Sequence, residues 1–109
     1  MKPIKTKVTQ DDINNGIEGH DTGCAIALAL ERQGFECLVG ELSTTIEHPG
    51  GMAHTDFEHD EIICAWIEMF DLNPRRCYPI EIIFDPETLM AIYQPDIRFP
   101  NIGPIILRR

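Results

Sequence analysis

The feature that most constrains the fold is a run of apolar residues from Cys24 to Leu30. The surrounding pattern predicts a helix from about Gly23 to Gln33, with Asp21 or Thr22 as its N-cap. Residues 25–30 are apolar on every face of such a helix, so nearly all of its sides need cover. A sheet covers only one side. We therefore expect a partner helix or a second copy of the chain to cover the rest.

The remaining pattern predicts a second main helix and several strands. Apolar residues at helical spacing place the second helix at about His59 to Phe70. Short alternating or apolar runs between turn residues predict strands at Ile4–Thr9, Phe35–Val39, Thr44–Ile46 and Tyr78–Phe84. Together these elements predict an α+β fold, in which a small single-layer sheet of about four strands, partly antiparallel, packs against two main helices.

Two shorter helices are also expected. Thr9, followed by acidic residues, is typical of an N-cap, and Gly16 would end that helix in the left-handed conformation. Asp85-Pro-Glu-Thr88 would start the other helix, with Asp85 as its N-cap and Pro86 at the first helical position.

Chain length and proline content indicate the domain organisation. The chain has 109 residues, which is enough for one hydrophobic core, so we expect a single domain over residues 1–109. Prolines at positions 95, 100 and 104 exclude regular structure from most of the C-terminal segment 94–109. The apolar residues near its end are expected to pack on the body of the protein or on a neighbouring subunit.

The charge balance limits the class of partner. Eighteen acidic residues against nine Lys and Arg give a net charge of −9. Such a field repels phosphates, so direct binding to nucleic acid is not expected. A protein partner with a basic surface fits better, although acidity also serves solubility alone. The candidate binding residues form an acidic cluster at Asp56, Glu58, Asp60, Glu61 and Glu68.

The sequence also predicts a location. Its longest uncharged apolar stretch is far too short to cross a bilayer, and the basic N-terminus lacks the apolar segment of a signal peptide. We therefore expect a cytoplasmic protein without membrane contact. In a reducing compartment its four cysteines are expected to be thiols and not disulfides.

Two stretches resemble a group of small, functionally uncharacterised proteins that are common in bacteriophage genomes. In the first, Thr6–Leu30, a strand, an Asp-Ile pair, a Gly and a cysteine-containing turn precede Ile-Ala-x-Ala, and the matching positions are Val8, Asp12, Ile13, Gly16, Cys24, Ile26, Ala27 and Ala29. The second joins Trp66–Asp71 to the strand Pro79–Phe84. The resemblance implies a phage-like origin, and hence the cytoplasm of a host cell, but no established activity.

The chain departs from this group at the cysteine-containing turn. The group often has Cys-x-x-Cys-Pro there, whereas Asp21 and Ala25 replace the first cysteine and the proline here. A zinc or redox role that needs two vicinal thiols is therefore not expected.

Cys24 is the most specific candidate for a catalytic residue. A thiol in the first turn of a helix lies at the positive end of the helix dipole, which favours the thiolate. His20 would accept the proton, and main-chain N–H groups of Gly23 to Ala25 would hold an oxyanion. The alternative is that Cys24 is a small buried apolar residue at the helix start.

The same helix N-terminus is a candidate anion site. Its free N–H groups would bind a phosphate, with Arg75 or Arg76 as a cationic partner at a subunit interface. This arrangement predicts a protein that sequesters a small anionic metabolite, such as a nucleotide immune signal. Asp21 argues against it, because its carboxylate would lie at the same positive end.

A third candidate is the histidine-rich stretch from His48 to Asp60. Imidazole and carboxylate groups are metal ligands, and His48, His54, Asp56 and His59 lie close together in sequence. Their spacing matches no known metal-binding motif. The His-x-x-x-His pair is missing, because Ile63 and not a second His occupies the helix position four residues after His59. A solvated loop followed by helix-capping residues explains the same pattern.

The preferred interpretation is a small accessory protein that acts by binding and not as an enzyme, with no cofactor. It would engage or inhibit a host component, for example a defence factor, through its acidic surface, and it would do so as a homo-oligomer. Sequestration of an anionic metabolite, and thiol chemistry at Cys24 and His20, are the alternatives.

Overall fold

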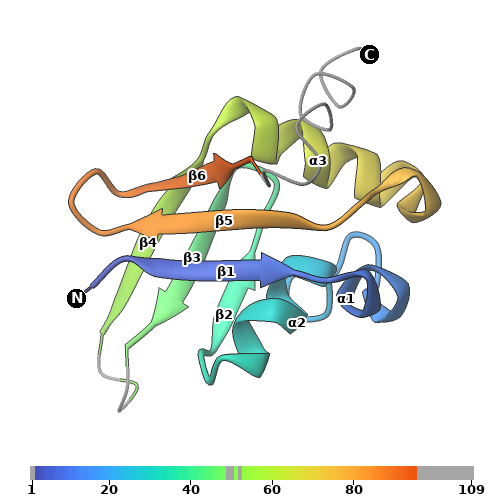
Figure 1. Cartoon of the computed structure of the whole chain (residues 1–109). Helices are drawn as coiled ribbons and strands as arrows, with labels where there is room; N and C mark the ends of the chain where they lie inside the picture. Colours follow the sequence, from blue (N-terminus) through green and yellow to red (C-terminus); the bar gives the residue numbers. More distant parts are fainter. Residues whose placement is uncertain (1, 49–50, 52, 96–109) are drawn as a thin grey trace.

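The computed structural model describes residues 2–48, 51 and 53–95 (Figure 1). Within these residues, strands and helices follow one another along the chain as β1 (Ile4–Val8), α1 (Gln10–Asn15), α2 (Ala25–Arg32), β2 (Cys37–Val39), β3 (Ser43–Glu47), β4 (His54–His59), α3 (Glu61–Leu72), the 3₁₀ helix η1 (Pro74–Arg76), β5 (Ile80–Asp85) and β6 (Met90–Gln94). The predicted class, α+β, agrees with this arrangement. Most of the C-terminal segment 94–109 lies outside the described residues.

The strands form one sheet of six in the order β1-β5-β6-β4-β3-β2. All neighbours are antiparallel except β4 and β6, which run parallel. The sheet curls: in Figure 1, β1, β5 and β6 run across the front, while β4, β3 and β2 cross behind them at a steep angle. The expectation of about four strands is therefore wrong.

The two strands that the sequence pattern did not predict are β4 and β6, and each has a physical explanation. In β4 the inward side chains are Thr55, Phe57 and His59, so only one large apolar residue marks its buried face. The second missed strand, β6, follows the segment predicted as a short helix. That segment is instead the turn that joins β5 to β6, where Leu89 N–H donates to the Asp85 carbonyl and Leu89 has a φ of 58°.

The helices cover the inner face of the curled sheet. Helix α2 packs against both edge strands, β1 and β2, and α1 packs on α2, whereas α3 packs against β4 and β6. Ala25, Ala27 and Leu30 are 0% exposed as a result. The apolar run is thus covered within a single chain, because the sheet curls around it. This removes the reason for expecting a second copy there.

Two glycines are needed for different reasons. Gly34, just after the end of α2, has a φ of +94°, the left-handed conformation that glycine adopts readily after a helix. Gly16 is not left-handed, because its φ is −71°. A Cβ at this position would lie 2.7 Å from the Ala25 nitrogen and 2.8 Å from the Phe70 ring. Gly16 therefore lets the connection between α1 and α2 pass close to the start of α2 and to the Phe70 side chain of α3.

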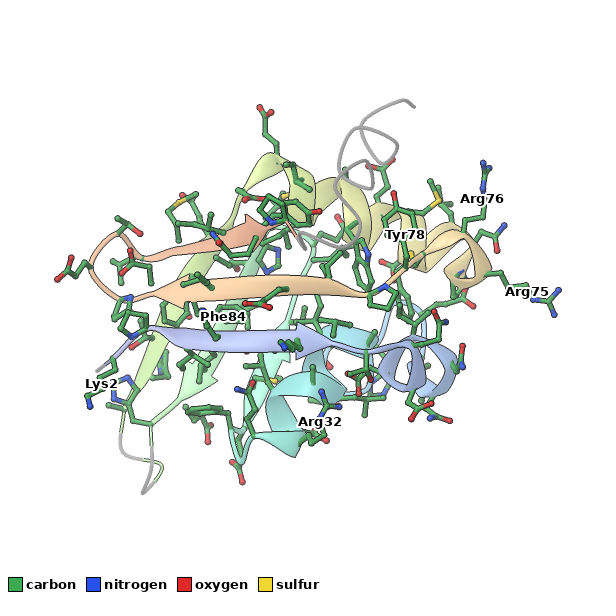
Figure 2. All side chains as sticks on the ribbon, viewed as in Figure 1. Lys2, Arg32, Arg75, Arg76, Tyr78 and Phe84 are labelled. Carbon is green, nitrogen blue, oxygen red and sulfur yellow. The ribbon has the colours of Figure 1, made fainter. Side chains whose placement is uncertain are left out.

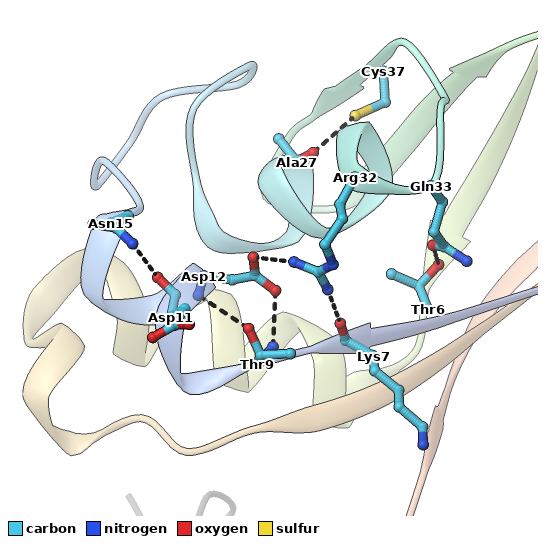
Figure 3. A network of polar contacts seen from close by, with 10 residues as sticks. All are labelled: Thr6, Lys7, Thr9, Asp11, Asp12, Asn15, Ala27, Arg32, Gln33 and Cys37. Carbon is cyan, nitrogen blue, oxygen red and sulfur yellow. Dashed lines mark hydrogen bonds and ion pairs between the residues drawn. The ribbon is translucent and has the colours of Figure 1, made fainter.

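The edge strand β1 is covered by side chains from the end of α2 (Figure 3). Arg32 donates to the Lys7 carbonyl at 2.9 Å, and Gln33 donates to the Lys5 carbonyl at 2.7 Å. The Thr6 hydroxyl donates to the Gln33 side-chain oxygen. These bonds occupy backbone acceptors that an edge strand would otherwise expose.

None of the described helices reaches the length and apolar character that crossing a lipid bilayer requires.

Candidate functional site

The sequence candidates at the start of α2 line a cavity of about 340 Å³. Its walls come from the Gly19–Cys24 loop, from β2 with the turn after it, and from α3. The loop is held on two sides: Gly19 N–H donates to the Asp71 carboxylate at 2.8 Å, and Val39 N–H donates to the Asp21 carbonyl at 2.8 Å. The cavity is therefore a fixed feature of the fold.

Cys24 and His20 both line this cavity, but their surroundings oppose thiol chemistry. Burial raises the pKa of the Cys24 thiol, and the Asp71 carboxylate adds to that rise. Main-chain N–H groups of Ile26 and Ala27 lower it, although by less. A reactive cysteine needs the opposite balance.

The proposed base also has another neighbour. The ring Nδ1 of His20 lies 3.3 Å from the Thr22 hydroxyl, and the ring is exposed. Cys24 is itself the N-cap of α2 and makes no side-chain capping bond. Asp21 and Thr22 are not the cap, contrary to expectation.

Within one chain, the anion alternative lacks its cations. Arg75 and Arg76 belong to η1, which follows α3, and Figure 2 shows both side chains pointing outward. Neither lines the cavity at the start of α2, whose wall carries the carboxylates of Asp21, Glu41 and Asp71. A cavity lined in this way repels a phosphate.

Strand β4 separates the candidate metal ligands. Its alternation points His54 and Asp56 to the outer face and His59 to the inner face. His48 instead makes a 2.6 Å contact with the Thr55 hydroxyl. Among the described residues no three His, Cys, Asp or Glu side chains gather as a metal site.

His59 has a structural role. Its Nδ1 lies 3.2 Å from the Glu41 carbonyl, which only accepts, so Nδ1 carries the proton. Nε2 lies 2.6 Å from the Thr44 hydroxyl, which donates to it. In the neutral ring both nitrogens therefore have a hydrogen-bond partner. Burial lowers the pKa of His59.

The predicted acidic cluster divides into exposed members and one with a structural role. Asp56, Glu58, Glu61 and Glu68 are exposed. Asp60 is not available, because one carboxylate oxygen accepts from Ile63 N–H at 2.8 Å, as the N-cap of α3, and the other accepts from Tyr93 N–H at 2.7 Å. Asp60 therefore joins α3 to β6.

Sequence reasoning missed how strongly the charge is segregated. Residues 33–74 contain nine Asp and Glu and no Lys or Arg, so this segment alone carries a charge of −9, equal to that of the whole chain. In the structure the segment forms β2, β3, β4 and α3, which lie together. Counting charge by segment would have found it.

It also missed a group of exposed leucines. Leu42, in the turn between β2 and β3, is 71% exposed, and Leu72, at the end of α3, is 75% exposed. Both line a second hollow, also of about 340 Å³, beside the first. The two hollows share Glu41, Ile67 and Asp71 in their walls.

Comparison of the chain with protein-family models, with curated proteins and with solved structures found no match.

Proposed function

We propose that the protein acts by binding, and that its acidic half, residues 33–74, occupies a basic surface of a partner protein. The observation that supports this is that residues 33–74, the segment that contains β2, β3, β4 and α3, carry a charge equal to the net charge of the whole chain. The resemblance to bacteriophage proteins makes a component of a host cell the expected partner. The protein would then be an accessory factor that engages or inhibits that component.

The outer face of β3 and β4 provides the surface. In the sheet register, Asp56 pairs with Thr45 and Glu58 pairs with Ser43, so the two carboxylates lie on neighbouring rows of the same face. Asp56 accepts a hydrogen bond from Thr45. Neither strand contains a Lys or Arg that would neutralise this face.

The same face extends to the ends of these strands. Glu47 pairs with His54, and Glu47 N–H donates to the Glu36 carbonyl. The hydrogen bond between the Glu36 and Glu47 carboxyl groups, followed by the repulsion between their charges, raises the pKa of Glu47. Glu36 and Glu47 thus place two adjacent acids at the end of this face, which fit a surface that a partner's cations complete.

The physical advantage of such a surface is fast association. Complementary charge steers a partner during diffusion and raises the association rate, an effect that salt screens. A polyanionic face would also compete with nucleic acid for a basic groove, since both present closely spaced negative charges.

The test is displacement of labelled duplex DNA from a panel of basic DNA-binding domains, followed by fluorescence anisotropy at low and high salt. We expect displacement from at least one domain, with an affinity that falls as salt rises. The variant Asp56→Lys/Glu58→Lys should lose at least about tenfold in affinity, as expected for charge reversal at the centre of an interface.

The matched control is Glu18→Lys/Glu87→Lys, which changes net charge equally but at exposed acids outside residues 33–74. It should lose much less. Equal losses in the two variants would show that only net charge matters. Displacement that is unaffected by salt, or its absence across the panel, would contradict the proposal.

A further inference from the structure

The hollow between α3 and the turn after β2 has the make-up of a docking groove. Its floor includes Ile67, which is 8% exposed, and its sides carry Leu42 and Leu72. Two leucines more than 70% exposed at one hollow place apolar surface in water, which is costly unless a partner covers it. The other strongly exposed apolar side chains on the described part of the chain, Ile17, Leu38 and Leu89, do not line this hollow.

Carboxylates surround the apolar surface. Glu41, Glu68 and Asp71 line the same hollow, and the adjoining cavity adds Asp21. Asp71 is held in place by its hydrogen bond from Gly19 N–H. An apolar floor with a purely acidic rim is complementary to a segment that has apolar residues on one side and Lys or Arg beside them.

The geometry favours a helical segment over an extended one. An added strand needs a free sheet edge, and at the nearest edge the Val39 N–H already donates to the Asp21 carbonyl. The wall formed by α3 presents Cys64, Glu68 and Leu72 at intervals of four residues. Such a row packs against the corresponding row of a second helix.

We infer that this groove docks a basic amphipathic helix of the partner, with leucine-type side chains between Leu42 and Leu72 and with Lys or Arg at Glu41 and Asp71. The inference rests on the proposed function, because it names the part of a basic partner that the acidic half would hold.

The probe is a fluorescein-labelled peptide of about two heptads, in which Leu residues at helical spacing form one face of an amphipathic helix and Lys residues form the other. Its binding to the full chain is measured by anisotropy. Two control peptides have Glu in place of Lys, or the same composition in an order without an apolar face. We expect the probe to bind and both controls to bind at least about tenfold more weakly.

Leu42→Ser/Leu72→Ser should weaken probe binding at least about tenfold, whereas Leu38→Ser, at an exposed leucine outside the groove, should leave it within about twofold. Glu41→Lys should also weaken binding. Equal affinity of the wild type and the double leucine variant, or failure of the wild type to bind the probe, would overturn the assignment.

Two further outcomes would overturn it by naming another occupant. If Ile106→Ser/Leu107→Ser tightens probe binding, the chain's own C-terminal residues compete for the groove. If native mass measurement shows a dimer that Leu42→Ser/Leu72→Ser dissociates, the occupant is a second copy. The proposed function fails separately, if the DNA displacement assay shows no displacement or no dependence on salt while the probe still binds the groove. If displacement behaves as expected and the probe does not bind, only the groove assignment is wrong.

Discussion

The guanidinium of Arg32, at the end of α2, hydrogen-bonds the carboxylate of Asp12 in α1, of which only 6% of the side-chain surface is exposed (Figure 3). The other oxygen of this carboxylate accepts from Thr9 N–H at 2.8 Å, and the Thr9 hydroxyl accepts from Asp12 N–H, which completes a capping box. One ion pair therefore joins α1, α2 and the end of β1.

Removing the cation should destabilise the fold. Arg32→Met would leave the Asp12 carboxylate buried without its charged partner, and it would also free the Lys7 carbonyl. Because Arg32 is half exposed, water relieves part of the loss, so we expect a fall of about 1–2 kcal/mol in the free energy of unfolding. Urea denaturation measures it, with the exposed Arg76→Met as control. Equal stability of the two variants would show that the ion pair contributes nothing.

Gly16→Ala should destabilise the protein without any change in charge. The added methyl would overlap the Ala25 nitrogen and the Phe70 ring, and such overpacking costs about 1–3 kcal/mol. The control is Gly40→Ala, whose Cβ would meet only the Ser43 carbonyl, at 3.4 Å. Thermal unfolding of the two variants compares them; if Gly16→Ala melts no lower than Gly40→Ala, the close approach at Gly16 is incorrect.

His59 should make stability depend on pH on the acidic side of neutrality. Burial lowers the pKa of His59 in the folded state, so the unfolded chain binds the proton more tightly. Stability from this group is complete above the unfolded pKa, about 6.5, and it falls as pH decreases below that value. The free energy of unfolding of His59→Gln should fall less between pH 7 and pH 5 than that of the wild type. Parallel curves would refute the assignment.

Glu47→Gln should stabilise the protein at neutral pH. The neighbouring Glu36 raises the pKa of Glu47 in the folded state. Between the unfolded and the folded pKa, the folded state therefore keeps a proton on Glu47 that the unfolded state releases. Wild-type stability therefore falls as pH rises through the raised pKa, and the variant lacks this loss. The melting temperature should rise at pH 7 in low salt, and the gain should shrink at pH 4 and in high salt. Glu87→Gln, at an exposed acid away from Glu36 and Glu47, is the control.

The four thiols should react slowly with iodoacetamide. Burial raises the pKa of Cys24 and of Cys64, and it raises the pKa of Cys37 and Cys77 to about 12. At pH 8 Cys24 should be alkylated at least about tenfold more slowly than free cysteine, since the thiolate is the nucleophile. Peptide mass mapping over time measures each site. Rapid, selective alkylation of Cys24 would restore the thiol-enzyme hypothesis.

The sequence predicted the elements that have a strong local signal. The helix expected at about Gly23–Gln33 is Ala25–Arg32, and the strand expected at Tyr78–Phe84 is Ile80–Asp85, because both segments have continuous or regularly spaced apolar residues. The number of strands was underestimated because β4 is defined by its long-range pairing with β3 and β6 and not by its local sequence pattern. Its polar outer residues, taken alone, are typical of a loop.

The candidate site was harder to predict, because its parts come from distant segments. Leu42 and Leu72 are unremarkable in sequence, and only the packing of α3 beside the β2–β3 turn brings them to one hollow. Asp60 shows the converse: its charge pointed to binding, but two backbone N–H groups occupy its carboxylate. Segment charge was readable from the sequence; burial and hydrogen bonding were not.

The covering of β1 by Arg32 and Gln33 has a consequence for self-association. Fibril growth needs an open strand to act as a template, and the Lys5 and Lys7 carbonyls are already engaged there. A second molecule would have to displace both side chains before it could extend the sheet at that side. At this edge of the sheet, misassembly should therefore begin only after the end of α2 has unravelled.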